Sequence, residues 1–227
     1  MEERGEAASQ PALRRPGQHA SSRVRDLNGQ MLAIVGSAVV VMLIAWTAFA
    51  LRGLPFALLS LALIGVMGTA HHHLSPKVER WLQGAEGERE VAAVLTQLKA
   101  DGWQAIHDIS LGRGNVDHIL VGPGGIFTIE TKSNRGRIGI DRIDPKMLKQ
   151  AYAQKKLLER ITGLDVQPLL VFSQAYLVGS VPAQRKGVTV LPARMLQHYF
   201  SRRRPTIETS EANEVYTRLA AALSQTS

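Results

Sequence analysis

The sequence predicts an α/β domain preceded by a two-helix transmembrane hairpin, and two observations lead to this expectation. Two long runs near the N-terminus contain no charged residue, although the whole chain carries a net charge of +8. Beyond residue 84, short runs rich in Ile, Val and Leu alternate with amphipathic helical patterns, an order typical of α/β folds. The 227 residues include no Cys, which excludes disulfides, thiolate metal sites and Cys nucleophiles.

The N-terminal part of the chain is first polar and then strongly apolar. Residues 1–30 show no apolar periodicity, so we expect a disordered basic and polar tail. Residues 31–51 and 54–70 match the roughly 17–25 residues that cross a bilayer, which predicts a transmembrane helical hairpin over residues 31–73. The alternative, a pair of buried core helices, would need more surrounding soluble chain than the sequence offers.

Basic residues predict how this hairpin is oriented. Several Arg residues precede the first apolar run, Lys77 and Arg80 follow the second, and the connecting loop carries only Arg52. The positive-inside rule then places both ends of the hairpin in the cytoplasm. We therefore expect a multi-pass protein of the cell membrane, with the lipid bilayer as one partner and a cytoplasmic C-terminal domain.

The rest of the chain is expected to form a folded domain over residues 77–200, followed by a basic segment and helix over residues 201–227. Apolar residues at helical spacing predict a helix over residues 86–100, and Asp144-Pro145 is a typical start for another that reaches about Thr162. Strands are expected over residues 103–109, 115–121, 126–132, 167–172 and 188–191, and shorter helices over residues 195–200 and 211–223.

Two neighbouring strands carry three charged residues inside apolar runs. If residues 122–125 form the turn between them, facing residue numbers sum to 247, and Asp117 lies opposite Glu130. Side chains alternate between the faces of a strand, so Lys132 shares the face of both carboxylates. At about 5 Å and an effective dielectric of about 20, the carboxylates repel by roughly 3 kcal/mol. A divalent cation between them would turn this repulsion into coordination, and Lys132 would neutralise charge or contact a reacting oxygen.

Two further features each have two interpretations. Glu88 lies on the apolar stripe of its helix, but an acid in a first turn also stabilises a helix through its dipole, and the helix pattern alone favours that interpretation. The basic, Gly-containing segment over residues 133–140 either holds phosphates beside the carboxylates or is a solvated turn.

The order of these residues resembles the nuclease-related domain (NERD) of the PD-(D/E)xK restriction-endonuclease-like superfamily. The resemblance covers roughly residues 84–200, and the residues that carry it are 84–88, Asn115-Val116-Asp117-His118, 129–132, and Pro145 with Gln150. One departure is Val116, where Pro stands in the founding motif, a position that supplies backbone shape and packing. The resemblance implies a restriction-endonuclease-like mixed central sheet flanked by helices.

The resemblance also implies a metal site. Asp117 and Glu130 would bind Mg²⁺, or Mn²⁺ as the alternative, and the Thr131 carbonyl would supply a third oxygen. Carboxylates, carbonyls and water are the ligands that such hard cations take. His118 belongs to the same pattern but faces away from Asp117 by strand alternation, so we expect it to have a structural or supporting role.

The catalytic roles follow from the same resemblance. Lys132 would orient the attacking water or help to deprotonate it. Glu88 matches the acid of the family's first helix, which replaces the dipole interpretation reached from the helix alone. Gln150 corresponds to a helix glutamine that supports the site in related nucleases.

The sequence therefore predicts a membrane-anchored, divalent-metal-dependent nuclease that hydrolyses phosphodiester bonds in DNA or RNA on the cytoplasmic face. One alternative is a non-catalytic module, tethered to the membrane, that binds nucleic acid or a nucleotide, which the basic surplus of the chain favours. Another is a scaffold in which the three charges form only a buried ion network. Because a nuclease that cuts both strands often needs two copies, a homodimer is a further expectation.

Overall fold

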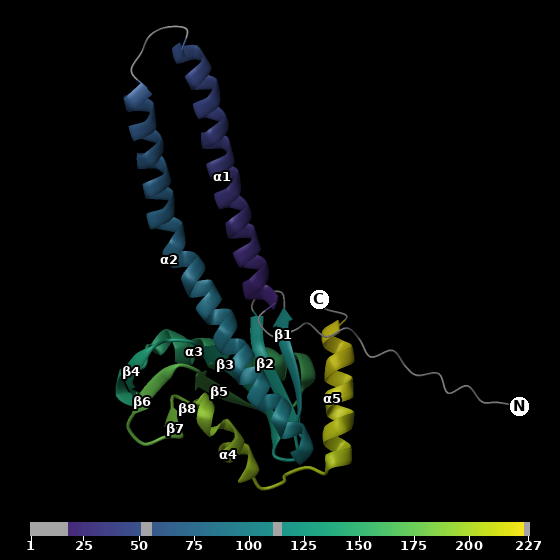
Figure 1. Ribbon diagram of the computed structural model, residues 1–227. Coiled ribbons are helices and arrows are strands. Elements are labelled where there is room, and N and C mark those ends of the chain that lie inside the picture. The colour runs from purple at the N-terminus through teal and green to yellow at the C-terminus, as the bar shows by residue number, and fades with distance from the viewer. Residues whose placement is uncertain (1–17, 51–55, 111–114, 225–227) are drawn as a thin grey trace, which may run out of the picture. The chain divides into compact units, whose positions relative to one another are not determined.

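The computed structural model describes residues 18–50, 56–110 and 115–224, and the chain divides into two compact units (Figure 1). One unit comprises the described residues from 19 to 85, and the other comprises the described residues from 86 onwards. The first unit holds most of α1 (Gln18–Ala50) and the first part of α2 (Phe56–Gln97). The second unit holds the end of α2 and a mixed sheet, and every residue predicted to form the functional site belongs to it.

The predicted transmembrane hairpin over residues 31–51 and 54–70 is not supported. Within the described ranges, no helix combines the length and the apolar character needed to cross a membrane. The helices that carry these runs extend far beyond them, because α1 begins at Gln18 and α2 continues through Pro76 to Gln97. The predicted multi-pass membrane location, with both ends cytoplasmic, is therefore wrong. The loop at residues 52–53 lies outside the described residues.

The predicted disordered tail is also wrong in part. Residues 18–30 belong to α1, whereas residues 1–17 lie outside the described residues. Once a helix has a nucleus, each added residue gains a backbone hydrogen bond at little further cost. The helix of the apolar run therefore extends backwards through a polar segment whose own pattern did not predict it.

The main sheet has six strands in the order β1-β2-β3-β5-β8-β7. Its strands are β1 (Gln104–Ser110), β2 (Asn115–Gly122), β3 (Gly125–Lys132), β5 (Val166–Phe172), β7 (Ala183–Arg185) and β8 (Val188–Pro192). Strands β3, β5 and β8 run parallel, and the other neighbouring pairs are antiparallel. The sheet is thus mixed, as predicted.

A second, smaller sheet pairs β4 (Gly136–Gly139) with β6 (Ala175–Val178) in parallel. The sequence predicted a loop or short strand over residues 133–140, and it predicted neither β6 nor β7. Segments of three or four residues are too short to show a reliable strand periodicity. Both strands of this small sheet follow directly on the ends of two central strands, since β4 comes after β3 and β6 after β5.

Helices pack against both faces of the main sheet. One face is covered by the end of α2, by η1 (Leu98–Asp101) and by α4 (Leu196–Ser201), whose apolar side chains pack against Phe127 and Ile129. The other face is covered by α3 (Pro145–Thr162) and α5 (Thr209–Ser224), which pack around Ile126 among other residues. Because side chains alternate along β3, the even-numbered residues of this strand face α3.

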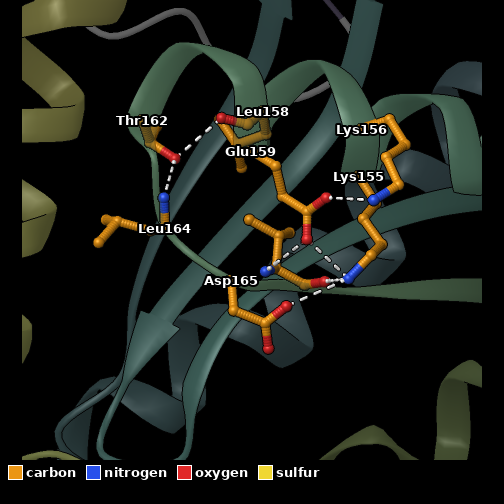
Figure 2. A network of polar contacts seen from close by, with 8 residues as sticks. Lys155, Lys156, Leu158, Glu159, Thr162, Leu164 and Asp165 are labelled. Carbon is orange, nitrogen blue, oxygen red and sulfur yellow. Dashed lines mark hydrogen bonds and ion pairs between the residues drawn. The ribbon is translucent and has the colours of Figure 1, made fainter.

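Helix α3 begins and ends as predicted. The Asp144 side chain accepts a hydrogen bond from the Lys146 N–H at 2.8 Å, Pro145 occupies the first turn, and the helix stops at Gly163 in the left-handed conformation. Its last two turns are joined to the start of β5 by a polar network that includes Lys155, Glu159 and Asp165 (Figure 2). This network joins the end of α3 to β5, and the apolar packing of α3 against the sheet sets the face that it presents to β3.

Candidate functional site

The candidate site lies where β3 ends and β2 begins, beside α3. The predicted register is confirmed: β2 and β3 pair from His118 with Ile129 to Gly122 with Gly125, and every pair sums to 247. Asp117 and Glu130 occupy the next position of this register. Lys132 ends β3 next to Phe172 at the end of parallel β5, and the Ser173 N–H donates to the Lys132 carbonyl at 3.0 Å.

Asp117 is held by the backbone of the neighbouring strand. Its Oδ2 accepts the Thr131 N–H at 2.7 Å, and the residue is partly buried. Asp117 therefore has one oxygen fixed at the strand end. The sequence predicted that the Thr131 carbonyl binds the metal, and no contact in the structure tests this prediction. The contact that the structure shows is made by its N–H, and the Thr131 Oγ1 is buried with no hydrogen-bond partner among the described residues.

Glu130 is the most deeply buried acid of the site, with a side chain only 2% exposed. Lys132 Nζ lies 2.6 Å from its Oε1 and donates to it, and the same Nζ donates to Gln150 Oε1 at 3.1 Å. The structure therefore brings together three of the predicted site residues, from β3 and from α3. Because Lys132 holds two acceptors at once, its ammonium group has a defined position.

Gln154 belongs to this cluster, and the sequence interpretation missed it. Its Nε2 donates to Glu130 Oε2 in a short hydrogen bond, and also to the carbonyl of Asn115 at 2.9 Å. It is 6% exposed, and its Oε1 has no hydrogen-bond partner among the described residues. A signal was present, because Gln154 follows Gln150 by four positions and so lies on the same face of α3.

Electrostatic repulsion within the site acts on Asp117. Burial raises the pKa of Asp117 well above its usual value, and the negative charges of Glu130 and Glu88 raise it further. The Thr131 N–H and Lys132 offset only part of this effect. Glu88, on α2, is therefore near enough to the strand pair to act on Asp117, and its role as a catalytic acid stays a prediction.

Gly87, next to Glu88, explains how α2 comes so close to the sheet. A Cβ at this position would lie 1.9 Å from Ser133 Oγ and 2.4 Å from Ser173 Oγ, closer than real Cβ atoms come. Ser133 follows β3 and Ser173 follows β5, so the helix packs directly on the strand ends that carry the site. The absence of a side chain at Gly87 brings Glu88 near the carboxylates.

His118 lies on the opposite face of β2 from Asp117, because successive side chains of a strand alternate between its faces. It is fully buried and pairs with His107 on β1, the two Nδ1 atoms being 2.8 Å apart. Burial lowers the pKa of His107, and burial together with His107 lowers the pKa of His118 well below its usual value. Both shifts favour the uncharged form of the two rings.

The residues of the site fit a divalent cation. Among the described residues, no three His, Asp or Glu side chains converge as a ready-made cage. Mg²⁺, however, commonly takes only one or two carboxylates and completes its shell with water and substrate oxygen. Asp117 and Glu130 supply such oxygens, and a carboxylate has about four acceptor positions, so their existing hydrogen bonds leave capacity. A cation would also relieve the repulsion that raises the pKa of Asp117.

The fold and the site define a mixed α/β domain with an acidic, lysine-bearing cluster at the ends of its central strands. Residues 83–173 match the model of a family, NERD, the nuclease-related domain. This segment contains Glu88, the strand pair, α3 and β5. The resemblance read from the sequence is therefore confirmed over this segment, although it was expected to reach about residue 200. The match suggests a nuclease-like function with nucleic acid as partner.

Among solved structures, the chain is similar to protein VC1899 from Vibrio cholerae, with 14% sequence identity and a TM-score of 0.30. The similarity covers 91% of this chain and 55% of that chain, so this chain spans about half the length of the other protein. A likeness this distant carries no argument about fold or activity. No curated protein matches the sequence.

Proposed function

We propose that the second unit is a divalent-metal-dependent hydrolase that cleaves phosphodiester bonds in nucleic acid. The main support is the convergence of Asp117, Glu130 and Lys132 at one strand end, inside the segment that matches a nuclease-related family. The mixed sheet flanked by helices is compatible with a restriction-endonuclease-like architecture, which forms part of this proposal.

Asp117 and Glu130 would hold the cation, and the backbone carbonyl of Thr131 would supply a third oxygen. Bound there, the metal would lower the pKa of a water and stabilise negative charge on a phosphate oxygen. The protein prepares this position beforehand: Thr131 fixes one oxygen of Asp117, and Gln154 and Lys132 fix the two oxygens of Glu130. Hydrogen bonds to metal ligands of this kind usually determine their orientation and basicity.

Lys132 would act on the reacting atoms. An ammonium group has three N–H donors, and Glu130 and Gln150 each accept one from Lys132. We assign the remaining donor to the attacking water or to a phosphate oxygen. Fixed in this way, the positive charge would lie where negative charge grows in the transition state, which is usually the largest single contribution to catalysis. Gln150 serves as a positioning residue for this ammonium group.

The experiment that tests the proposal measures cleavage of end-labelled DNA and RNA by the full chain, in Mg²⁺ and in EDTA. We expect Mg²⁺-dependent cleavage that Lys132→Ala reduces by about 100-fold or more, the usual size for loss of one transition-state donor. Lys149 is an exposed lysine on α3, so Lys149→Ala is the matched control and should cleave like the wild type. Equal cleavage by the wild type and Lys132→Ala would refute catalysis through this site.

A second candidate function is a module that binds nucleic acid without cutting it. The exposed basic side chains on β4 and η3 (Ala193–Met195) favour this candidate. Salt-dependent binding that survives Glu130→Gln, with no turnover in Mg²⁺, would select it. The homodimer expected for an enzyme that cuts both strands stays a prediction, and sedimentation of the full chain tests it.

A further inference from the structure

An exposed aromatic ring on the small sheet contacts two arginines. Tyr176 is 54% exposed, whereas aromatic side chains usually bury most of their large apolar surface. The guanidinium carbon of Arg137 lies 5.3 Å from the centre of this ring, and that of Arg194 lies 5.4 Å from it. Both arginines are themselves exposed. We call Arg137, Tyr176 and Arg194 the arginine clamp.

The backbone fixes the parts of this clamp. Arg137 and Tyr176 are direct partners in the parallel pairing of β4 with β6. Ala175 and Leu177, on either side of Tyr176, are buried, so strand alternation directs the ring outward. Arg194 comes from a third element, η3, directly after β8. Three elements thus hold two positive charges against one ring, at separations typical of cation–π contacts.

The clamp lies close to the candidate active site along the chain. Lys132 ends β3, and Arg137 is five residues further on, so the two Cα atoms can be at most about 18 Å apart. On the second strand, Phe172 pairs with Lys132, and Tyr176 follows Phe172 by four residues. The small sheet therefore extends from the same strand ends that carry the site.

The chemistry of the clamp favours phosphate. A cation–π contact uses the flat face of a guanidinium, whereas the N–H donors lie in its plane and suit bidentate bonding to phosphate oxygens. Arg203 provides a contrast within the same molecule. It also stacks on aromatic rings, but its Nη2 donates to Gln167 and Tyr199, and its Nε is buried. Arg203 is thus part of the fold, while Arg137 and Arg194 are at the surface.

We propose that the arginine clamp binds the phosphodiester backbone of a nucleic acid and leads it to the site at Asp117, Glu130 and Lys132. This inference rests on the proposed function, because it identifies where the substrate of that site is held. The ring of Tyr176 keeps both guanidinium groups in place before the substrate arrives. Since phosphate contacts carry no sequence information, the clamp would accept nucleic acid of any sequence.

The test measures binding apart from cleavage. Fluorescence anisotropy of the full chain with labelled single-stranded DNA and RNA oligonucleotides, in EDTA and over a series of salt concentrations, gives both affinity and salt slope. Arg137→Ala and Arg194→Ala should each weaken binding several-fold and reduce the slope of log affinity against log salt by about 0.7, the value for one phosphate contact on a single strand. The DNA and RNA arms then show which sugar is preferred.

Two controls separate the clamp from general charge. Arg218→Ala removes the same charge from an exposed position on α5, which packs on β1 and β2, and should leave affinity and slope near the wild type. Tyr176→Phe keeps the ring and should bind normally, whereas Tyr176→Leu loses the cation–π contacts and should bind several-fold more weakly.

The outcomes are distinct from those of the cleavage experiment. If the clamp variants lose affinity while the wild type cleaves nothing, the clamp stands and the hydrolase proposal fails. If Arg137→Ala and Arg194→Ala bind like the wild type, the clamp is refuted even where cleavage continues. Equal losses in Arg218→Ala, or clamp-dependent binding to phosphatidylserine vesicles with none to either oligonucleotide, would also overturn it.

Discussion

Two clusters of acids and lysines touch α3, and their electrostatics are opposite. Near the end of the helix, Lys155 and Lys156 contact Glu159, and Lys155 also contacts Asp165 (Figure 2). Hydrogen bonds from these two lysines lower the pKa of Glu159 to about 2. Near the start of the helix, burial and the neighbouring acids Glu130 and Glu88 raise the pKa of Asp117 instead.

The difference is one of charge balance and burial. In the first cluster two cations face two anions near the surface, so each carboxylate has a partner of opposite charge. In the second, Lys132 is the one cation that contacts Glu130 among the described residues, and the negative charges of Glu130 and Glu88 both act on Asp117. The first cluster suits a structural role that holds the helix on β5. The second is costly without a further cation, which is typical of a functional site.

The largest expected effect comes from Asp117→Asn, because it removes a charge and keeps an oxygen for the Thr131 N–H. Cleavage in Mg²⁺ should fall by about 100-fold or more, since the loss of a ligand exceeds the roughly 10–100-fold cost of changing a group that supports one. In EDTA the same variant should unfold at a higher temperature than the wild type, because like-charge repulsion is relieved. A lower melting temperature in EDTA would refute the repulsion that we infer.

Gln154→Leu should have the next largest effect. It removes the hydrogen bond to Glu130 Oε2 and the one to the Asn115 carbonyl. We expect the Mg²⁺ concentration for half-maximal cleavage to rise by about 10–100-fold. This shift in metal dependence, measured by titration, would not follow from a loss of stability alone. An unchanged Mg²⁺ requirement would show that Gln154 only packs.

Glu159→Gln should have a smaller effect and one confined to stability. It removes the negative charge that Lys155 and Lys156 share, so the melting temperature should fall. Mg²⁺-dependent cleavage, measured well below the melting temperature, should stay at the wild-type rate, since none of these residues contacts the site. A large loss of cleavage by the folded variant would contradict the separation of the two clusters.

The smallest effect is the pH dependence of the same network. The pKa of Glu159 is about 2 in the folded protein and near the ordinary value of 4.5 in the unfolded chain. A lowered pKa contributes stability above the unfolded value, and this contribution is lost as pH falls from about 4.5 towards 2. Unfolding by denaturant over this range should show a steeper acid loss for the wild type than for Glu159→Gln. An equal loss of stability with falling pH in both proteins would contradict the effect of Lys155 and Lys156 on the pKa of Glu159.

Much of the second unit could be predicted because its signals are local. The two-residue turn between β2 and β3 and the alternation of side chains fix the register that brings Asp117 near Glu130. Asp144 and Pro145 mark the start of α3 in the sequence alone. Gln150 and Glu88 needed the family resemblance, because nothing in their own helices distinguishes a site residue from a surface one.

The features that the sequence did not predict depend either on contacts between distant segments or on how far a helix extends. Gln154 is identified only when α3 is placed on β3, and the arginine clamp only when β4 pairs with β6. The apolar runs near the N-terminus predicted spans by length, but they belong to helices that continue through polar segments. A run of apolar residues shows where a helix is, and it does not show where that helix ends.

The most direct test of the central claim is the melting temperature of the full chain in Mg²⁺ and in EDTA, for the wild type and for Asp117→Asn. A cation held by Asp117 and Glu130 stabilises the folded state in proportion to its binding. Mg²⁺ should therefore raise the melting temperature of the wild type and leave that of Asp117→Asn nearly unchanged. An equal response of both proteins, or no response of the wild type at millimolar Mg²⁺, would contradict a metal site at this strand pair.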